Sequence, residues 1–158
     1  MTIWKTAENL STCLCAQFEI DCGKALCFCG VVPGGEVALE YMGDCGEECG
    51  MAWVQVTGTY PASGVGIPNI TPSNCWLGLG VDVQVGVARC MPVGDERGGP
   101  PTLAQLQEAA EQQAQDMETV RKAVLCCQTE DLIVGRMTPF GPDGGVYGFA
   151  VEINYLVT

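Results

Sequence analysis

Histidine does not occur anywhere in the 158 residues of this sequence. Its absence removes Ser–His and Cys–His catalysis, together with every metal site that needs an imidazole ligand. Basic residues are also few, with 7 Lys and Arg against 19 Asp and Glu and a formal net charge of −12. A chain of this charge does not grip a phosphate backbone by attraction. Two interpretations remain open: simple solubility, or a surface that must not adhere to nucleic acid, such as the wall of a DNA conduit.

Long apolar runs are missing as well. No segment approaches the roughly 18–20 apolar residues that a membrane-spanning helix needs. The stretch Met1–Leu10 contains Glu8 and lacks the apolar run of an export signal. We therefore expect a chain that is made in a cytosol and that does not engage a membrane.

Cysteine, in contrast, is abundant. The 11 cysteines are Cys13, Cys15, Cys22, Cys27, Cys29, Cys45, Cys49, Cys75, Cys90, Cys126 and Cys127. An odd number cannot all pair within one chain. Without an export signal we expect buried free thiols for most of them, although a particle that later leaves the cell could oxidise some.

The loop Cys45-Gly-Glu-Glu-Cys49 is the most conspicuous candidate for chemistry. It could contribute to a metal site, form a local disulfide, or hold two free thiols in a tight turn. A structural zinc site usually combines paired C-x₂₋₄-C units or histidines, which this sequence does not provide. Free thiols are the interpretation we favour, and we predict no metal and no cofactor.

Other constellations that carry chemistry do not occur either. The sequence has no C-x-x-C redox motif, and its glycine-rich runs lack the Lys and Ser/Thr of a phosphate loop. No nucleophile stands with a base, so we expect a protein that is not an enzyme. Arg89 interrupts the apolar face of a strand, where we expect it to reach solvent or to pair with an acid of a neighbour. Cys127 continues an apolar helical stripe, which predicts core packing.

The C-terminal half shows two clear periodicities. In Leu79–Arg89 apolar residues alternate with polar or small ones, and the same alternation returns in Val146–Val157; both predict strands. Between them, Pro100–Cys127 predicts a long helix that begins at a Thr102/Gln105 capping box. Its expected apolar stripe comprises Leu103, Leu106, Ala110, Met117, Val120, Val124 and Cys127. A helix of this length can cross a sheet and place the last strand beside the first.

Shorter elements make up the rest of the chain. Thr2–Glu19 predicts an amphipathic helix whose buried face includes Trp4, Ala7, Leu14 and Phe18. Lys24–Val32 and Glu36–Met42 flank a Pro-Gly-Gly turn and predict a hairpin. Further strands are expected at Met51–Tyr60, Cys75–Met91 and Glu130–Thr138, with Pro92–Pro101 as a loop and Pro139–Gly145 as a turn.

Pro61–Asn74 is the longest expected loop, and loops of this length inside a compact domain are usually functional or mobile. The residues predicted to contact another protein there are Tyr60, Pro61, Val65, Ile67, Pro68 and Ile70. The element order predicts a single α+β domain over residues 1–158, with a mixed or antiparallel sheet. An N-terminal helix and a long crossover helix should pack on one face of that sheet.

Two segments resemble the neck proteins of long-tailed phages that infect actinobacteria. One is Val85-Gly-Val-Ala-Arg-Cys-Met-Pro92 followed by Pro100-Pro-Thr-Leu-Ala-Gln-Leu106. The other is Leu132-Ile-Val-Gly-Arg-Met-Thr-Pro-Phe-Gly-Pro-Asp-Gly-Gly145, which runs into the last strand. Among neck proteins, the order of a helix, a β-sheet and a second helix crossing to a final strand resembles the tail terminator.

This resemblance implies a structural virion protein at the head–tail junction, assembled in the host cytoplasm. Tail terminators form a hexameric ring that caps the tail tube and joins it to the head connector. The implied partners are other copies of the chain, a stopper or connector protein and the major tail tube protein, with DNA passing through the lumen. The alternatives are a stopper, a minor tail protein or a tube protein, and, beyond these, a cysteine-based metal-binding protein.

Overall fold

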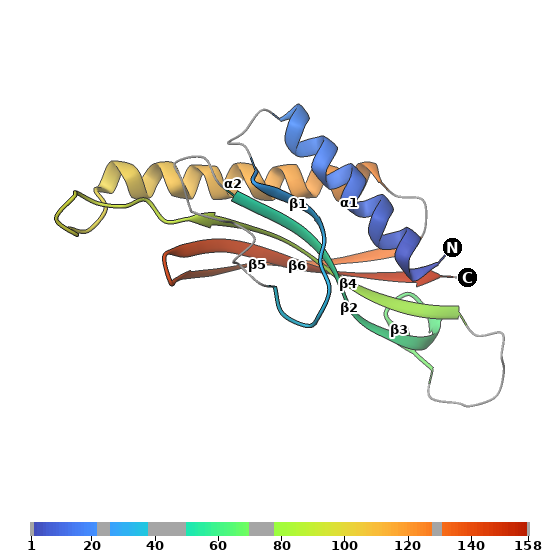
Figure 1. Cartoon of the computed structure of the whole chain (residues 1–158). Coiled ribbons are helices and arrows are strands. Elements are labelled where there is room, and N and C mark those ends of the chain that lie inside the picture. The colour runs from blue at the N-terminus through green and yellow to red at the C-terminus, as the bar shows by residue number, and fades with distance from the viewer. Residues whose placement is uncertain (1, 22–25, 38–49, 70–77, 128–130, 158) are drawn as a thin grey trace.

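A computed structural model describes residues 2–21, 26–37, 50–69, 78–127 and 131–157 of the chain. The fold is α+β, as the sequence predicts. Its elements in order are α1 (Ile3–Ile20), β1 (Phe28–Val31), β2 (Gly50–Gly64), β3 (Ile67–Pro68), β4 (Gly78–Cys90), α2 (Leu103–Cys126), β5 (Leu132–Asp143) and β6 (Val146–Val157). Figure 1 shows the long, twisted strands beneath two helices.

The strands form one six-stranded mixed sheet in the order β1-β2-β4-β6-β5, with the two-residue strand β3 attached to β2. The β1 strand runs parallel to β2, and the other pairs are antiparallel. The last strand therefore lies beside β4, as the crossover helix predicts. The parallel pairing of β1 differs from the expected hairpin, whose second arm falls largely in residues 38–49, outside the described part of the chain.

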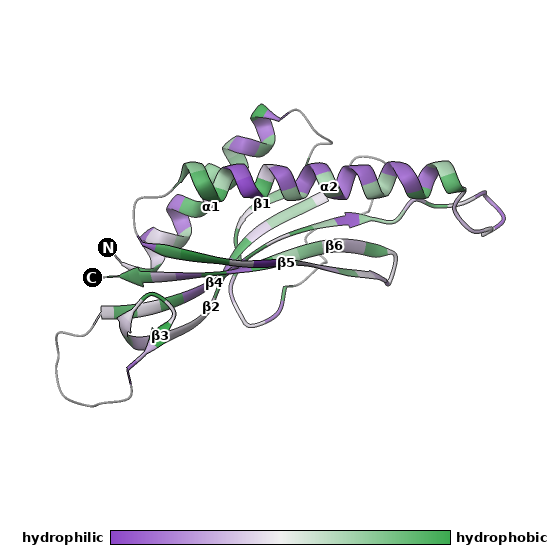
Figure 2. Ribbon diagram, turned by 180° about the vertical axis from the view of Figure 1, so that it is seen from behind, coloured by the Kyte–Doolittle hydropathy of each residue, from purple (hydrophilic) through white to green (hydrophobic). Residues whose placement is uncertain are grey.

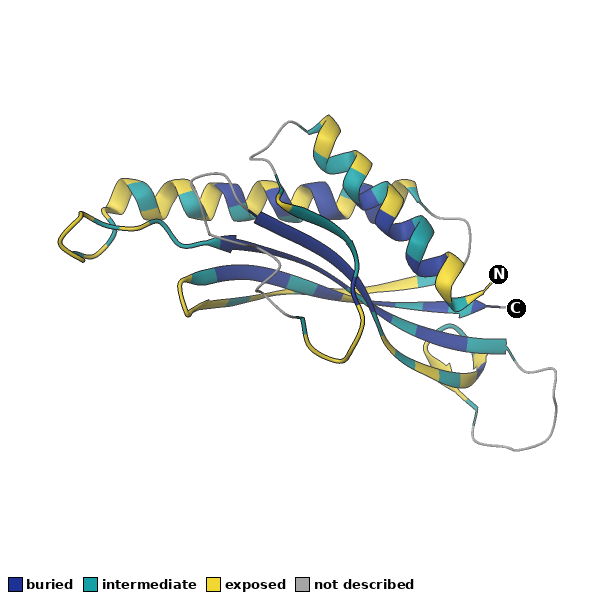
Figure 3. Cartoon of the chain, viewed as in Figure 1, coloured by how far each residue is buried: buried dark blue, intermediate teal, exposed yellow. Residues whose placement is uncertain are grey.

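Both helices lie on the same face of the sheet and enclose the main core. Val81, Val83, Val85 and Val87 of β4 are fully buried beneath them, which confirms the alternation in the sequence. Leu10 and Leu14 of α1, Val120 and Val124 of α2, and Phe149 and Ile153 of β6 complete the cluster. The central strands are buried over most of their length, while β5 is largely exposed (Figure 3).

The helix α1 starts at Thr2, whose hydroxyl accepts a hydrogen bond from the Lys5 N–H. Its buried face consists of Thr6, Ala7, Leu10, Ser11 and Leu14. Trp4 is 60% exposed, so its predicted place on the buried face is wrong. Ile3, one residue earlier, packs against the core together with Ala7, Leu10 and Leu14, so Trp4 lies beside the buried stripe and points away from the sheet.

The predicted capping box of α2 is confirmed: the Thr102 hydroxyl accepts from the Gln105 N–H, and the Gln105 side chain accepts from the Thr102 N–H. The predicted apolar stripe is wrong over the first turns. Leu103 and Leu106 are exposed, and so is Ala110, because this end of α2 reaches beyond the strands (Figures 1 and 2). Burial begins at Gln112 and continues to Val124.

Two strands are longer than the sequence predicts. The expected turn Pro139–Gly145 is strand up to Asp143, and the chain reverses only at Gly144 and Gly145, both with positive φ. The expected loop from Pro61 is also wrong for residues up to 68. β2 continues to Gly64, with Pro61 opposite Leu79 of β4, and β3 then returns along it. Proline keeps its carbonyl acceptor, and here the Asn69 N–H donates to the Pro61 oxygen at 2.8 Å.

A smaller apolar cluster lies on the other face of the sheet, called the helix-free face because no helix of the described residues covers it. It consists of Val32, Met51, Trp53 and Ala88, with Phe140 packed against it; the rings of Trp53 and Phe140 are 6.3 Å apart. The chain after β1 crosses this face. Gln55 holds it there, because its buried amide nitrogen donates to the Gly34 oxygen at 2.6 Å and also to the carbonyls of Pro33 and Glu36.

Candidate interaction surfaces

Polar side chains cover the middle of the helix-free face and bond to one another across three strands. The Trp53 indole N–H donates to Gln84, and the Gln84 amide donates to Glu152 of β6. Thr57 of β2 also donates to Glu152, at 3.3 Å. Asn154 donates to the Asp82 carboxylate on β4. This network fixes an acidic and polar surface on β2, β4 and β6.

A short hairpin extends this face. Tyr60 and Pro61 belong to the end of β2, Val65 to the turn, and Ile67 and Pro68 to β3. The structure thus gathers five of the six predicted contact residues into one hairpin, which is called the arm below (residues 60–68). Ile70 lies outside the described residues. Ile67 is 58% exposed, so the arm presents an apolar side chain to its surroundings.

The arm is held against the sheet by Tyr60. Its hydroxyl donates to the Asp82 carboxylate and accepts from the Gly66 N–H. Desolvation raises the pKa of the Tyr60 hydroxyl, and the negative charge of Asp82 raises it further. The turn also lies close to β5 at the edge of the sheet, since a Cβ built on Gly66 would lie 3.5 Å from Cδ1 of Ile133. The arm is therefore a fixed feature of the fold.

Of the two alternatives expected for Arg89, exposure to solvent is wrong, and pairing with an acid is found within the chain itself, with Asp116 of α2. Arg89 is 4% exposed under α2, where its Nε and Nη2 each donate to a different oxygen of Asp116 at 2.8 Å. Gln112 donates to the same carboxylate at 2.9 Å. Burial raises the pKa of the nearby Tyr147 hydroxyl, and the charge of Asp116 adds to that increase. This arrangement joins α2 to the sheet and leaves the carboxylate fully engaged.

The cysteines also differ from the sequence-based expectation of mostly free thiols. Cys13 is bridged to Cys127 and Cys15 to Cys29, with Cα–Cα distances of 6.1 and 5.8 Å. Two residues apart on α1, Cys13 and Cys15 project in different directions, so one bridge holds the end of α2 and the other holds β1. Of the seven cysteines in the described ranges, six are disulfide-bonded, since Cys27 and Cys90 are oxidised too. Cys126 is free and exposed.

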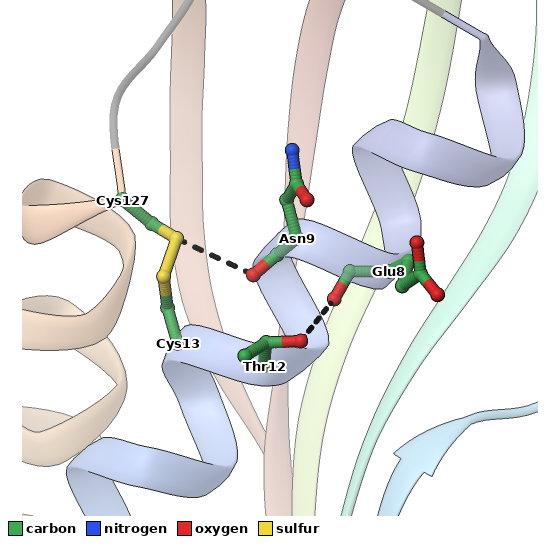
Figure 4. Close-up of a disulfide and its surroundings, with 5 residues drawn as sticks. All are labelled: Glu8, Asn9, Thr12, Cys13 and Cys127. Carbon is green, nitrogen blue, oxygen red and sulfur yellow. Dashed lines mark hydrogen bonds between the residues drawn. A yellow bond between two sulfur atoms is a disulfide. The ribbon is translucent and has the colours of Figure 1, made fainter.

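The predicted core packing of Cys127 is therefore wrong, as is the expectation of mostly free thiols. Figure 4 shows the Cys13–Cys127 bridge between the two helices. The Cys127 sulfur lies 3.4 Å from the Asn9 carbonyl oxygen. A bridged sulfur carries no proton, so the contact becomes a hydrogen bond only when the bridge is reduced. Cysteines two positions apart on a helix point in different directions, so the spacing of Cys13 and Cys15 indicates two different partners. It does not indicate which cysteines those partners are.

The candidate metal and disulfide residues Cys45 and Cys49 lie outside the described residues. Among the residues that are described, no three His, Cys, Asp or Glu side chains gather in a way that could hold a metal ion.

A shallow groove of about 230 Å³ runs between the end of α1 and the middle of α2. Phe18, Asp21 and Thr119 line it, together with Lys122. The Asp21 carboxylate accepts from the Thr119 hydroxyl and the Gln17 amide at 2.8 Å. The Thr119 bond is the main cause that lowers the pKa of Asp21, and Lys122 adds to it. These side chains satisfy one another, so the groove joins the helices rather than exposing reactive groups.

No helix in the described ranges is long and apolar enough to cross a membrane. Neither protein-family models nor curated proteins match the chain.

Proposed function

We propose that this chain is a structural protein of a phage neck, a tail terminator whose subunits form a ring on the tail tube and join it to the head connector. The proposal rests on the resemblance of two segments of the sequence to neck proteins of actinobacterial phages. The α+β fold supports it, because a helix, a sheet and a second helix that leads back to the last strands resemble the element order of that class.

The observation that carries the proposal is the arm. Its Ile67 side chain is exposed at the end of the sheet, on a hairpin tied to the sheet through Tyr60 and Asp82. An exposed apolar side chain on a fixed hairpin is suited to contact a neighbouring subunit or the tube. A head-to-tail contact of this kind uses different surfaces on the two subunits, and it forms a ring when the rotation from one subunit to the next closes on itself.

The electrostatics of the face agree with a conduit. Asp82 and Glu152 lie on the helix-free face, and the chain as a whole carries a charge of −12. A ring of such subunits would repel DNA from its wall and let it pass without adhering. The disulfides are compatible with a particle that leaves the reducing cytosol after assembly.

Imaging the purified protein mixed with tail tubes tests the proposal. A tail terminator forms a single ring at one end of each tube. A chain repeated along the tube would identify a tube protein, and a ring bound to connectors but not to tubes would identify a stopper. A protein that stays monomeric and binds neither would exclude all three neck functions.

A further inference from the structure

The outer edge of β5 offers a short, unprotected length of strand. In the described part of the chain no strand pairs with that edge. After Val134, β5 contains Pro139 and Pro142 and two irregularities in its pairing with β6, one between Val134 and Met137 and one between Phe140 and Asp143. Prolines and bulges are the usual means by which sheet edges resist pairing. The segment from Leu132 to Val134 has neither.

The backbone of this segment is oriented for pairing. The Leu156 N–H donates to the Asp131 oxygen at 3.4 Å, which places the polar groups of Asp131 on the β6 side. Backbone groups alternate in direction along a strand. The N–H and C=O groups of Leu132 and Val134 therefore point outward, away from β6. The exposed Ile133 and Val134 side chains, at 49% and 39%, lie on opposite faces of this edge.

The charges at the two ends of the segment are opposite and unpaired. Asp131 precedes it and Arg136 follows it, both exposed. Neither side chain has an ion pair in the described part of the chain, whereas Lys5, Arg89, Arg121 and Lys122 all have one. Five residues of extended chain span about 16 Å, so Asp131 and Arg136 cannot reach each other within one subunit.

The bulge in β5 places both charges on one face of the sheet. Val134 pairs with Ile153 and Met137 with Val151, so Gly135 and Arg136 together oppose the single residue Glu152. Arg136 therefore shares the helix-free face with Glu152. Asp131 lies opposite Leu156, on that same face.

We infer that β5 pairs with the β5 strand of a second copy of this chain, antiparallel and about a two-fold axis at Ile133. In this register Leu132 and Val134 of one copy exchange backbone hydrogen bonds with Val134 and Leu132 of the other. Ile133 meets Ile133 on the helix-free face. Asp131 of each copy lies beside the Gly135–Arg136 bulge of the other, which makes two symmetric ion pairs. The segment Asp131–Arg136 is thus complementary to itself in hydrogen bonding, apolar side chains and charge.

This contact is separate from the proposed ring and does not rest on it. A two-fold contact uses the same surface on both copies and closes on itself, whereas a ring needs a head-to-tail contact. The strand contact joins two free subunits. It is short compared with the ~1,000 Å² of a stable interface, and the net charge of −12 opposes it. The dimer should therefore dissociate on dilution.

Sedimentation equilibrium of the oxidised protein over a wide concentration range, at physiological ionic strength, tests the inference. We expect a reversible monomer–dimer equilibrium. Asp131→Arg or Arg136→Asp alone places like charges opposite each other twice and should weaken the dimer roughly tenfold. The double variant Asp131→Arg/Arg136→Asp restores both pairs with reversed sign and should recover the wild-type dissociation constant.

Val134→Pro is a second, independent variant, because it removes an outward N–H and spares the bonds to β6. It should abolish the dimer while circular dichroism and melting temperature show an intact fold. A wild-type protein that is monomeric at every concentration would overturn the inference. A folded double charge variant that dimerises no better than the single variants would overturn it as well.

Discussion

Cys13 on α1 and Cys127, directly after α2, are bridged although 114 positions separate them in the sequence. The bridge closes 114 of the 158 positions into one loop, while the Cys15–Cys29 bridge closes a loop of 14 positions. The two bridges leave α1 in opposite directions, so this helix is fixed to both the second helix and the first strand.

Removing the long-range bridge should destabilise the protein more than removing the local one. The entropy of loop closure gives about 4–5 kcal/mol for the Cys13–Cys127 bridge and about 3 kcal/mol for Cys15–Cys29. Urea denaturation of Cys13→Ser/Cys127→Ser and of Cys15→Ser/Cys29→Ser, both under oxidising conditions, measures the difference. Equal losses of unfolding free energy would show that loop length does not govern the contribution of these bridges.

The Arg89–Asp116 pair should be costly to break from one side. Asp116→Ala leaves the Arg89 guanidinium buried without its carboxylate, which typically costs about 3–5 kcal/mol of unfolding free energy. Asp116→Asn keeps an acceptor for Gln112 and should cost less. Urea midpoints of the two variants measure the effect.

Glu118→Ala is the matched control for that experiment, because it removes an ion pair with Arg121 in which both side chains are about half exposed. Exposed pairs contribute little, so the unfolding free energy of this variant should stay close to that of wild type. If Asp116→Ala were as mild as Glu118→Ala, the buried pair would not join α2 to the sheet as described.

Acid should weaken the link between the two helices through Asp21. Its pKa is lowered in the folded protein, first by the Thr119 hydroxyl. The carboxylate therefore contributes stability above its ordinary pKa of 3.8, and that contribution is lost as the pH falls through the lowered folded value. Thr119→Val should reduce this loss below about pH 4, whereas Thr119→Ser should preserve it. Melting temperatures that fall equally in both variants would argue against the hydroxyl as the cause.

Alkali should loosen the arm through Tyr60. Its pKa is raised in the folded state, so folding favours the neutral hydroxyl. That stability is fully present below the ordinary pKa of 10.0 and is lost as the pH rises through the raised value. Tyr60→Phe should remove this step, which hydrogen exchange at Gly66 can follow against pH. An unchanged alkaline profile in the variant would assign the step to another group.

Ile67→Asp should affect assembly and leave folding intact. The side chain is mostly exposed, so its replacement should change the unfolding free energy by no more than about 0.5 kcal/mol. If the arm contacts a neighbour, the variant should fail to join heads to tails. Val93→Asp, at an exposed site 79% open to solvent in the loop before α2, is the control. Deleting the whole stretch from Pro61 would be a poor test, because Pro61 and Ala62 pair with β4.

Much of the fold follows from local patterns. The alternation in Val146–Val157 coincides with β6 at both ends, and the Thr102/Gln105 capping box marks the start of α2. The capping box depends only on residues close in the sequence. The alternation in β6 depends on one face being buried, and the periodicity of apolar residues shows that face directly. The loop predicted from Pro61 and the turn predicted from Pro139 are wrong, because pairing with an adjacent strand outweighs the preference of proline and glycine for turns.

The long-range pairings were the part that the sequence did not reveal. Arg89 was seen to break an apolar face, but its partner lies on a helix whose buried stripe is polar at Gln112 and Asp116. Matching these two polar interruptions would have suggested the ion pair. The bridges from Cys13 and Cys15 connect elements whose proximity exists only in the folded sheet, so spacing alone could not select them from the alternatives.

The most direct test of the proposed function is negative-stain imaging of the purified, oxidised protein incubated with tail tubes. We expect one ring at one end of each tube, with the tube no longer able to extend. Tubes without rings, together with a chain that remains monomeric or dimeric in their presence, would contradict it.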